Sequence, residues 1–153
     1  MGTNTIKKAF STSMKKAGFG KKSDGWYLSM DDTILVVNLQ KSNFGEQYYI
    51  NLAVWLNELG QITFPKEYQC HIRTRATLLE PERQKYWEDK VFNLENTEIT
   101  EEERLELVQS FLENTAIPFL LSCGEVAELK RLHQEGQLKG AAVMANAQKI
   151  LQS

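Results

Sequence analysis

The chain has few of the residues that hold small secreted domains or metal centres together, since its 153 residues include two cysteines and two histidines. Two cysteines cannot build a disulfide framework, so we expect a reducing compartment, the cytoplasm. The N-terminal segment is amphipathic and rich in lysine, which argues against a secretory leader. The longest apolar run, Ala116 to Leu121, is far shorter than the roughly 20 residues of a membrane span. We therefore expect no membrane interaction.

Cysteine and histidine also give no metal site. Cys70 and His71 are neighbours on an expected strand, where adjacent side chains point to opposite faces and cannot reach one ion. Cys123 and His133 have no ligand spacing around them. A reactive thiolate at Cys123, near the start of an expected helix, is an alternative to a buried structural cysteine. We expect no metal and no cofactor, and we favour a binding protein over an enzyme.

Charge is distributed unevenly along a chain whose formal net charge is -2. The first 23 residues contain six lysines and no acid, whereas residues 80–113 contain eleven carboxylates and four basic residues. The lysines lack interleaved aromatic or arginine residues, so a solvated face is favoured over a nucleic-acid interface. The composition, with 42% hydrophobic and 25% charged residues, is that of one globular domain spanning residues 1–153.

Helical spacing of apolar residues is found at the start of the chain. Ile6, Phe10 and Met14 lie on one stripe, and Gly18 follows as a stop signal, which predicts a helix over residues 5–17. The lysines lie on the other side of this expected helix. The apolar stripe must therefore pack against another element of the fold.

The second half of the chain again has helical spacing, beginning at Pro81, a residue favoured at the first position of a helix. Thr100 to Glu103 has the spacing of a capping box, and Ser122 to Glu125 repeats it. Pro118 is expected to break the helix that starts after Thr100. An alanine-rich helix over residues 139–151 completes this part.

Between these helices, apolar and polar residues alternate with a period of two, which predicts strands. Four are expected, over residues 26–30, 33–40, 47–56 and 69–76, and turn signals between them favour an antiparallel meander. One side of the sheet is apolar, and we assign Ile50, Leu52 and Cys70 to it. The predicted fold is α+β, with an N-terminal helix, a four-stranded antiparallel meander and three or four C-terminal helices.

The opposite side of this expected sheet is unusually polar. Its candidate ligand-binding residues are Asn38, Gln40, Asn51, Trp55, His71, Arg73 and Arg75. Two guanidinium groups that project two residues apart on one face suit a carboxylate or phosphate, so a small anionic ligand is a candidate. The alternatives are a face open to solvent, or one covered by a helix whose carboxylates pair with the arginines.

A run of glutamates opens the helix expected after Thr100, and it is a candidate surface for a protein partner. Its members are Glu101, Glu102, Glu103 and Glu106. Negative charge at a helix start complements the helix dipole, which is the simplest explanation of the run. A glycosidase-like pair would need one carboxyl group in an apolar pocket, and the pattern does not provide it.

An ordered set of short motifs resembles a family of small bacterial proteins catalogued as a domain of unknown function. The motifs are Gly18-Phe19, Trp26, Val37 to Ser42, Tyr49 to Leu52, Cys70 to Arg75, Trp87 and Ile117 to Phe119. The likeness covers residues 6–136, although Ala53 stands where a glycine is expected. The resemblance supports the fold and implies no known activity. Members are similar in size and character to immunity and accessory proteins of bacterial conflict systems.

Two functions are therefore carried forward. The first is a non-enzymatic cytoplasmic binding protein, an immunity-like inhibitor of a basic bacterial toxin that docks on the acidic segment. The second is a module for a small anionic ligand, or an unrecognised enzyme, that uses the polar face of the sheet. Nucleic acid is not an expected partner in either case, because the overall charge is slightly negative.

Overall fold

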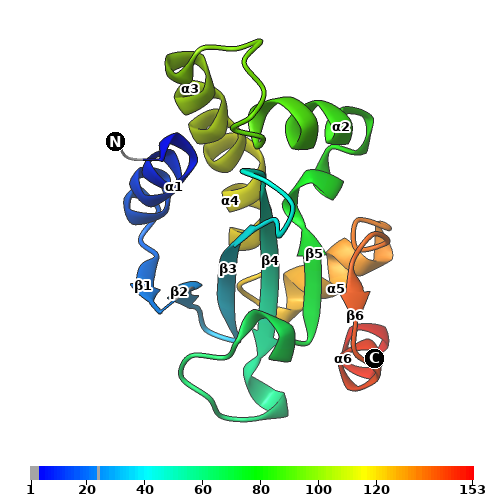
Figure 1. The fold of residues 1–153 in the computed structure, drawn as a ribbon. Coiled ribbons are helices and arrows are strands. Elements are labelled where there is room, and N and C mark those ends of the chain that lie inside the picture. Colours follow the sequence, from blue (N-terminus) through cyan, green and yellow to red (C-terminus); the bar gives the residue numbers. More distant parts are fainter. Residues whose placement is uncertain (1–3, 24) are drawn as a thin grey trace.

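A computed structural model of the chain describes residues 4–23 and 25–153. One antiparallel sheet lies at its centre, with its strands side by side in chain order (Figure 1). The strands are β1 (Gly20–Lys22), β2 (Gly25–Ser29), β3 (Thr33–Lys41), β4 (Tyr48–Leu56), β5 (Ile72–Arg75) and β6 (Ala142–Val143). The helices are α1 (Thr5–Lys16), α2 (Gln84–Tyr86), α3 (Glu101–Phe111), α4 (Ile117–Leu121), α5 (Val126–Gln134) and α6 (Ala145–Gln152). The α+β prediction is confirmed.

The sheet has six strands, whereas the sequence predicted four. The central meander of β2 to β5 is as predicted, and Asp31 and Asp32 form the tight turn between β2 and β3, closed by Met30 N–H to Thr33 O at 2.8 Å. β1 and β6 add one strand to each edge. With three and two residues, these strands are too short for an alternating pattern to reveal them.

The predicted first helix and its end are confirmed. Gly18 has a φ of +93°, and the N–H groups of Gly18 and Phe19 bond to the carbonyls of Lys15 and Met14 at 3.0 Å each. This is a Schellman ending, which favours glycine because other residues rarely adopt the left-handed region. Phe19 is then buried against the core, which fixes the path of the chain into β1.

The prediction that Pro118 breaks the helix that starts after Thr100 is wrong. α3 continues through a π-helical turn, Leu112–Ala116, into α4, and Pro118 lies in the first turn of α4. Proline has no N–H to donate to the preceding turn, and it is accommodated here where the wider π turn passes into α4. A second π-helical turn, Trp87–Val91, extends α2.

Two further predictions in this region are wrong in detail. The capping box over Ser122 to Glu125 does not form, because the Ser122 hydroxyl donates to Phe119 O at 2.5 Å and Asp32 Oδ2 instead accepts the Val126 N–H at 2.9 Å. The last helix begins at Ala145 rather than residue 139, since Ala142 and Val143 pair with β5. The capping box at Thr100 and Glu103 is confirmed, with bonds of 3.1 Å and 2.9 Å.

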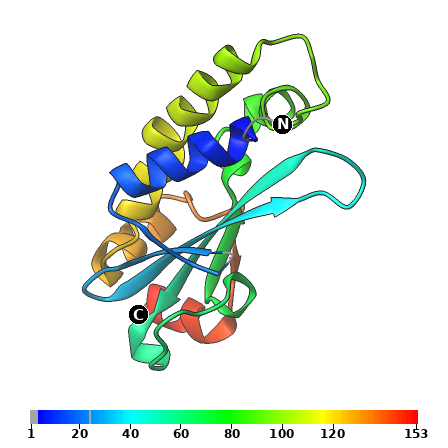
Figure 2. The same ribbon diagram turned by 60° about the vertical axis from the view of Figure 1, so that its left-hand side comes forward.

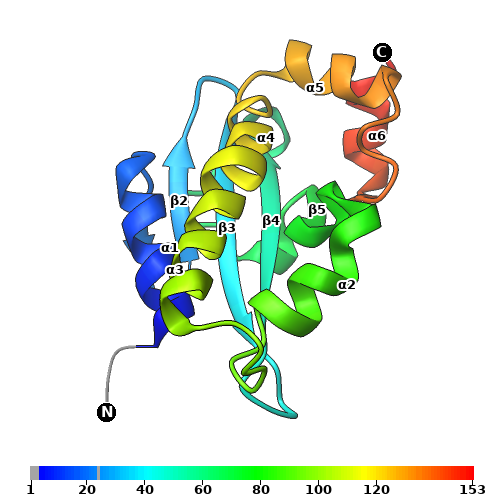
Figure 3. The same cartoon turned by 90° about the horizontal axis from the view of Figure 1, so that it is seen from above.

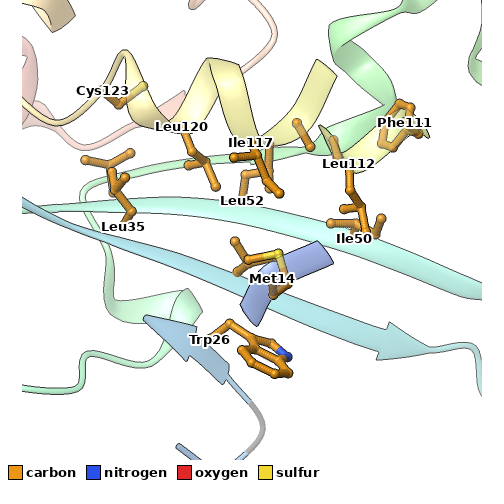
Figure 4. Packing of buried hydrophobic residues seen from close by; sticks show 14 of the residues in the cluster. Met14, Trp26, Leu35, Ile50, Leu52, Phe111, Leu112, Ile117, Leu120 and Cys123 are labelled. Carbon is orange, nitrogen blue, oxygen red and sulfur yellow. The ribbon is translucent and has the colours of Figure 1, made fainter. Parts of the chain in front are cut away.

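The apolar side of the sheet packs against the helices, as predicted. α1, α3 and α4 lie across this side in Figure 3, and Figure 4 shows Leu35, Ile50 and Leu52 of the sheet opposite Leu112 and Leu120. Burying such side chains supplies most of the driving force for folding. The helices therefore leave the polar side of the sheet to other segments.

A segment after β4 folds back over one half of that polar side. It runs over residues 57–69 and contains two short 3₁₀ turns, Asn57–Leu59 and Glu67–Gln69. A second small apolar cluster lies on this side of the sheet, formed by Ile34, Val36, Ala53 and Cys70 with Tyr27 and Trp55 packed against it. The assignment of Cys70 to the main core is wrong, because β5 begins at Ile72 and the alternation does not extend back to Cys70.

Candidate functional site

Strand register places the predicted polar residues in rows on one side of the sheet. Asn38 pairs with Asn51 and Asn51 with Arg75, so these three residues form one row across β3, β4 and β5. Gln40 and Tyr49 form the adjacent row, closer to the β3–β4 turn. The convergence of these residues on one face therefore agrees with the sequence pattern.

The amide groups in these rows bond to one another. Asn51 Nδ2 donates to Asn38 Oδ1 at 3.1 Å and to Gln40 Oε1 at 2.9 Å. Asn51 is buried, whereas Gln40 is exposed at the edge of the row. Because both hydrogens of the Asn51 amide are engaged, its orientation is fixed. These amide side chains therefore form a fixed polar surface, unlike surface side chains that move independently.

The two arginines of β5 have different partners. Arg73 forms a two-point ion pair with Glu67 of the covering segment, through Nε at 2.8 Å and Nη2 at 3.2 Å. These hydrogen bonds raise the pKa of Arg73 above its ordinary value. The alternative in which a covering carboxylate pairs with an arginine is therefore realised at Arg73, although Glu67 lies in a 3₁₀ turn rather than a long helix.

Arg75 is not neutralised in this way. Its guanidinium carbon lies 4.0 Å from the centre of the Tyr49 ring, and it pairs with no carboxylate in the part of the chain that the structure describes. An arginine stacked on an aromatic face keeps its charge and its planar set of N–H donors. Arg75 is half-buried, beside the amides of Asn51 and Gln40. Of the two arginines on this face, Arg75 is therefore the one that remains available to bind an external anion.

A groove of about 380 Å³ lies over this part of the sheet. Its lining includes Gln40, Asn51, Glu67, Arg73 and Arg75, together with Leu78 and Gly140. The groove therefore combines one free guanidinium, fixed amide groups and an ion pair on its wall. Both N–H groups of Asn51 are used within the cluster, so the donors left for a small carboxylate or phosphate are the guanidinium of Arg75 and the amide nitrogen of Gln40.

Trp55 and His71 lie in the covered half of the face, away from this groove. Their rings pack 4.3 Å apart, Trp55 Nε1 donates to Gly60 O at 3.0 Å, and His71 Nδ1 accepts the Leu56 N–H at 2.9 Å. Burial lowers the pKa of His71, which keeps its ring neutral. These contacts give both side chains a role in fastening the covering segment.

Neither thiol has the properties of a nucleophile. Cys70 and Cys123 are both buried and unpaired, and burial raises the pKa of each to about 12. Thiolate is the reactive form of cysteine, and a pKa of this size leaves almost none at neutral pH. Among residues 4–23 and 25–153, no three histidine, cysteine or acidic side chains lie close enough together to hold a metal ion.

The acidic helix start divides into engaged and free carboxylates. Glu101 hydrogen-bonds to Thr5 of α1 and to Arg104 Nε, which lowers its pKa, and Glu103 is used in the capping box. Glu102 and Glu106 are exposed and have no ion-pair partner among the described residues. The structure thus leaves two of the predicted glutamates available on the surface of α3.

Arg104 is an important residue that the sequence analysis missed. Its side chain is fully buried, and it donates to the carbonyl oxygens of Lys90, Val91, Asn93 and Asn96 at 2.6 to 3.0 Å. It holds the end of the π-helical turn after α2 against α3. The signal was its position on the same helical stripe as Val108 and Phe111, which predicts burial despite the charge.

None of the helices in the described ranges is long and apolar enough to cross a membrane. No curated protein and no solved structure matches the chain. A family model described as a domain of unknown function (DUF4304) matches residues 10–122, a stretch that includes the polar face of β3, β4 and β5 and the acidic start of α3. The predicted resemblance to a domain-of-unknown-function family is thereby confirmed, and the chain belongs to the DUF4304 family.

Proposed function

We propose that this chain is a non-enzymatic binding protein that recognises an anionic group through the open half of its polar sheet face. The observation that carries the proposal is the contrast between the two arginines of β5. Arg73 is satisfied by Glu67, whereas Arg75 is held over Tyr49 without a carboxylate partner in the described structure. A partly buried cation that the protein positions and does not neutralise is a ready site for an external anion.

The side-chain amides beside Arg75 determine how an anion is oriented in the groove. The Asn51 amide holds the side-chain oxygen of Gln40 at 2.9 Å, which leaves the Gln40 amide nitrogen as a fixed donor beside Arg75 for an anion in the groove. Fixed groups lose less conformational entropy on binding than mobile ones, which favours affinity. Glu67 is paired with Arg73, so that side of the groove has no net charge and the positive charge available to an anion is that of Arg75.

Calorimetric titration of the purified chain with acetate, inorganic phosphate and a phosphosugar tests this proposal. We expect saturable binding of at least one of these anions, and we expect Arg75→Ala to weaken it at least tenfold. Arg73→Ala combined with Glu67→Ala is the matched control, because it removes the ion pair as a unit and leaves the net charge of the groove unchanged. Equal losses from both variants, or no binding by the native chain, would count against the site.

A second candidate function is an immunity-like inhibitor that docks a basic toxin on α3 in the cytoplasm. The observation that favours it is the pair Glu102 and Glu106, which are exposed and lie four residues apart on one helix. Exposed charges of one sign increase the rate of association with a partner of opposite charge. Glu102→Lys with Glu106→Lys then slows association and reduces its dependence on salt.

The controls for this second function are Glu101 and Glu103. Their carboxylates are engaged with Thr5, Arg104 and Thr100, so charge reversal there damages the helix start as well as the surface. A partner that distinguishes the Glu102 and Glu106 variant from the native chain supports the acidic surface. If the association rate of the Glu102 and Glu106 variant equals that of the native chain, the acidic surface of α3 is not the docking site.

A further inference from the structure

The turn between β3 and β4 presents a single, almost fully exposed aromatic side chain. Phe44 is 98% exposed, more than any other large hydrophobic residue of the described chain. The hairpin that carries it extends beyond the helices and the rest of the sheet, as the cyan segment of Figure 2 shows. Phe44 is therefore a large apolar side chain that makes no contribution to the core and is available to a partner.

The turn that carries Phe44 is held by several hydrogen bonds. The Phe44 N–H bonds to Ser42 Oγ at 3.1 Å, Ser42 N–H to Gln47 O at 2.7 Å, and Lys41 Nζ to Gly45 O at 3.3 Å. A side chain on a structured turn is partly ordered before it binds. Its burial against a partner is then opposed by less lost entropy than burial of a mobile loop.

The same turn is also fastened to a second part of the chain. Glu95 Oε2 accepts the Glu46 N–H at 2.9 Å, and Leu94 N–H donates to Glu46 O at 2.8 Å. A Cβ at position 45 would meet the Glu95 carboxylate and would displace this flexible side chain from the Glu46 N–H. Glycine beside Phe44 thus leaves room for the contact that ties the hairpin to the segment after α2.

Phe44 lies at the end of the strands that form the proposed anion site. Gln40 and Tyr49 are paired across β3 and β4, and the turn begins after the next pair, Lys41 and Tyr48. At about 3.3 Å per residue, Phe44 is on the order of 10 to 15 Å from Gln40 along the hairpin. This separation is well within the span of an ordinary protein–protein interface.

Charge near the tip disfavours an anionic lipid surface as the occupant. Lys41 is paired with Glu46 at 3.7 Å, and Glu95 adds a further carboxylate beside Gly45. A membrane-inserting loop normally surrounds its aromatic residue with unpaired lysine or arginine. The unpaired guanidinium of Arg75 lies in the groove, where it can pair with one carboxylate but cannot lie against a lipid surface.

From these observations we infer that the occupant of the polar face is a protein, which accepts Phe44 in an apolar pocket and presents a carboxylate to Arg75. The inference rests on the proposed anion site and names the class of its partner. Phe44 supplies the desolvated anchor and Arg75 the orienting charge, a combination frequent among residues that dominate binding.

The test begins with a photoreactive phenylalanine, p-benzoylphenylalanine, placed at position 44 in cells that naturally produce the chain. The same residue at position 121 is the matched control, because Leu121 is 42% exposed on α4, on the helix side of the sheet. We expect one protein to cross-link from position 44 and not from position 121. That protein is then purified and its affinity measured against the native chain.

Three substitutions decide whether the cross-linked protein is the inferred partner. Phe44→Ser and Arg75→Ala should each weaken its binding at least tenfold, while Leu121→Ser leaves it unchanged. Replacing a partner carboxylate should cost nothing further in the Arg75→Ala background, because the two groups interact with each other. Circular dichroism of Phe44→Ser should match the native chain, since the side chain touches no core residue.

Several outcomes overturn the inference. The inference is wrong if the captured protein binds Phe44→Ser as tightly as the native chain, or if position 44 cross-links only to a second copy of the chain. It is also wrong if the chain floats with vesicles of phosphatidylcholine and phosphatidylserine in a way that depends on Phe44. If small anions bind at Arg75 and position 44 yields no specific cross-link, the inference fails and the proposed function stands. If anions do not bind at all, the proposed function fails.

Discussion

The guanidinium of Arg75 lies flat enough over Tyr49 to bring its central carbon within 4.0 Å of the ring centre. This contact holds the arginine in the groove without consuming its charge, because an aromatic ring accepts no proton and offers no carboxylate. Two residues earlier on the same face, Arg73 is paired with Glu67. Strand geometry places both arginines on one side, and their neighbours give them different roles.

The first prediction concerns the cost of removing each arginine. Arg75→Ala and Arg73→Ala should each lower the free energy of unfolding by about 1 kcal/mol, since half-exposed cation–π contacts and ion pairs contribute little. Urea denaturation followed by circular dichroism measures this. A loss of several kilocalories per mole from Arg75→Ala would show that the residue is structural and not held for a ligand.

Replacement of a core residue should have a much larger effect. Ile50→Ala or Leu52→Ala should each cost about 2 to 5 kcal/mol, because both side chains are buried between the sheet and the helices and a cavity would remain. The same denaturation experiment applies. Harmless replacements at these positions would contradict the assignment of the two faces of the sheet.

The two faces were predictable because period-two alternation is a direct consequence of strand geometry. Leu35, Ile50 and Leu52 could be placed in the core, and Asn38, Asn51 and Arg75 on the other side, without knowledge of tertiary contacts. The segment over residues 57–69 that covers part of the polar face was harder to predict from the sequence. Its signal was the apolar run of Ile34, Val36 and Ala53 on the polar face, which needs a cover to exclude water.

Other features depended on interactions between distant residues and could not be read locally. Asp32 replaces Ser122 as the cap of α5 because the turn after β2 packs beside the helix start. The pairing of Arg73 with Glu67, rather than of both arginines with one anion, depends on where the covering segment crosses the sheet. Pro118 follows a π-helical turn whose presence no sequence periodicity indicated.

Arg104 should be among the most sensitive residues of the chain. Arg104→Met should cost about 3 to 5 kcal/mol, since it leaves buried carbonyl oxygens without donors and Glu101 without its partner. Arg104→Lys should not restore stability, because one ammonium group cannot reproduce the planar set of N–H donors. Unfolding free energies of both variants provide the measurement, and a stable lysine variant would contradict this account.

Stability should also depend on pH through His71. Its folded pKa lies below the ordinary value of 6.5, so the unfolded chain binds a proton more readily. The contribution of His71 is fully present above 6.5 and is lost as pH falls through the folded pKa, when protonation also removes the acceptor for the Leu56 N–H.

The variant His71→Gln keeps an acceptor without titrating. It should show a flatter stability profile than the native chain as pH falls below 6.5, because the folded pKa of His71 lies below that value. Thermal denaturation at closely spaced pH values supplies the comparison. Parallel profiles for the two proteins would mean that His71 does not govern this part of the pH dependence.

The most direct test of the anion site is to follow the arginine side chains themselves. In a nuclear magnetic resonance titration with inorganic phosphate or acetate, the Nε–Hε signal of Arg75 and the side-chain amide of Gln40 should shift together and saturate. The Nε–Hε of Arg73 is an internal control, because it already donates to Glu67 at 2.8 Å. Shifts at Arg75 alone among the two arginines are the predicted result, and equal, unsaturated shifts at both would contradict the proposed function.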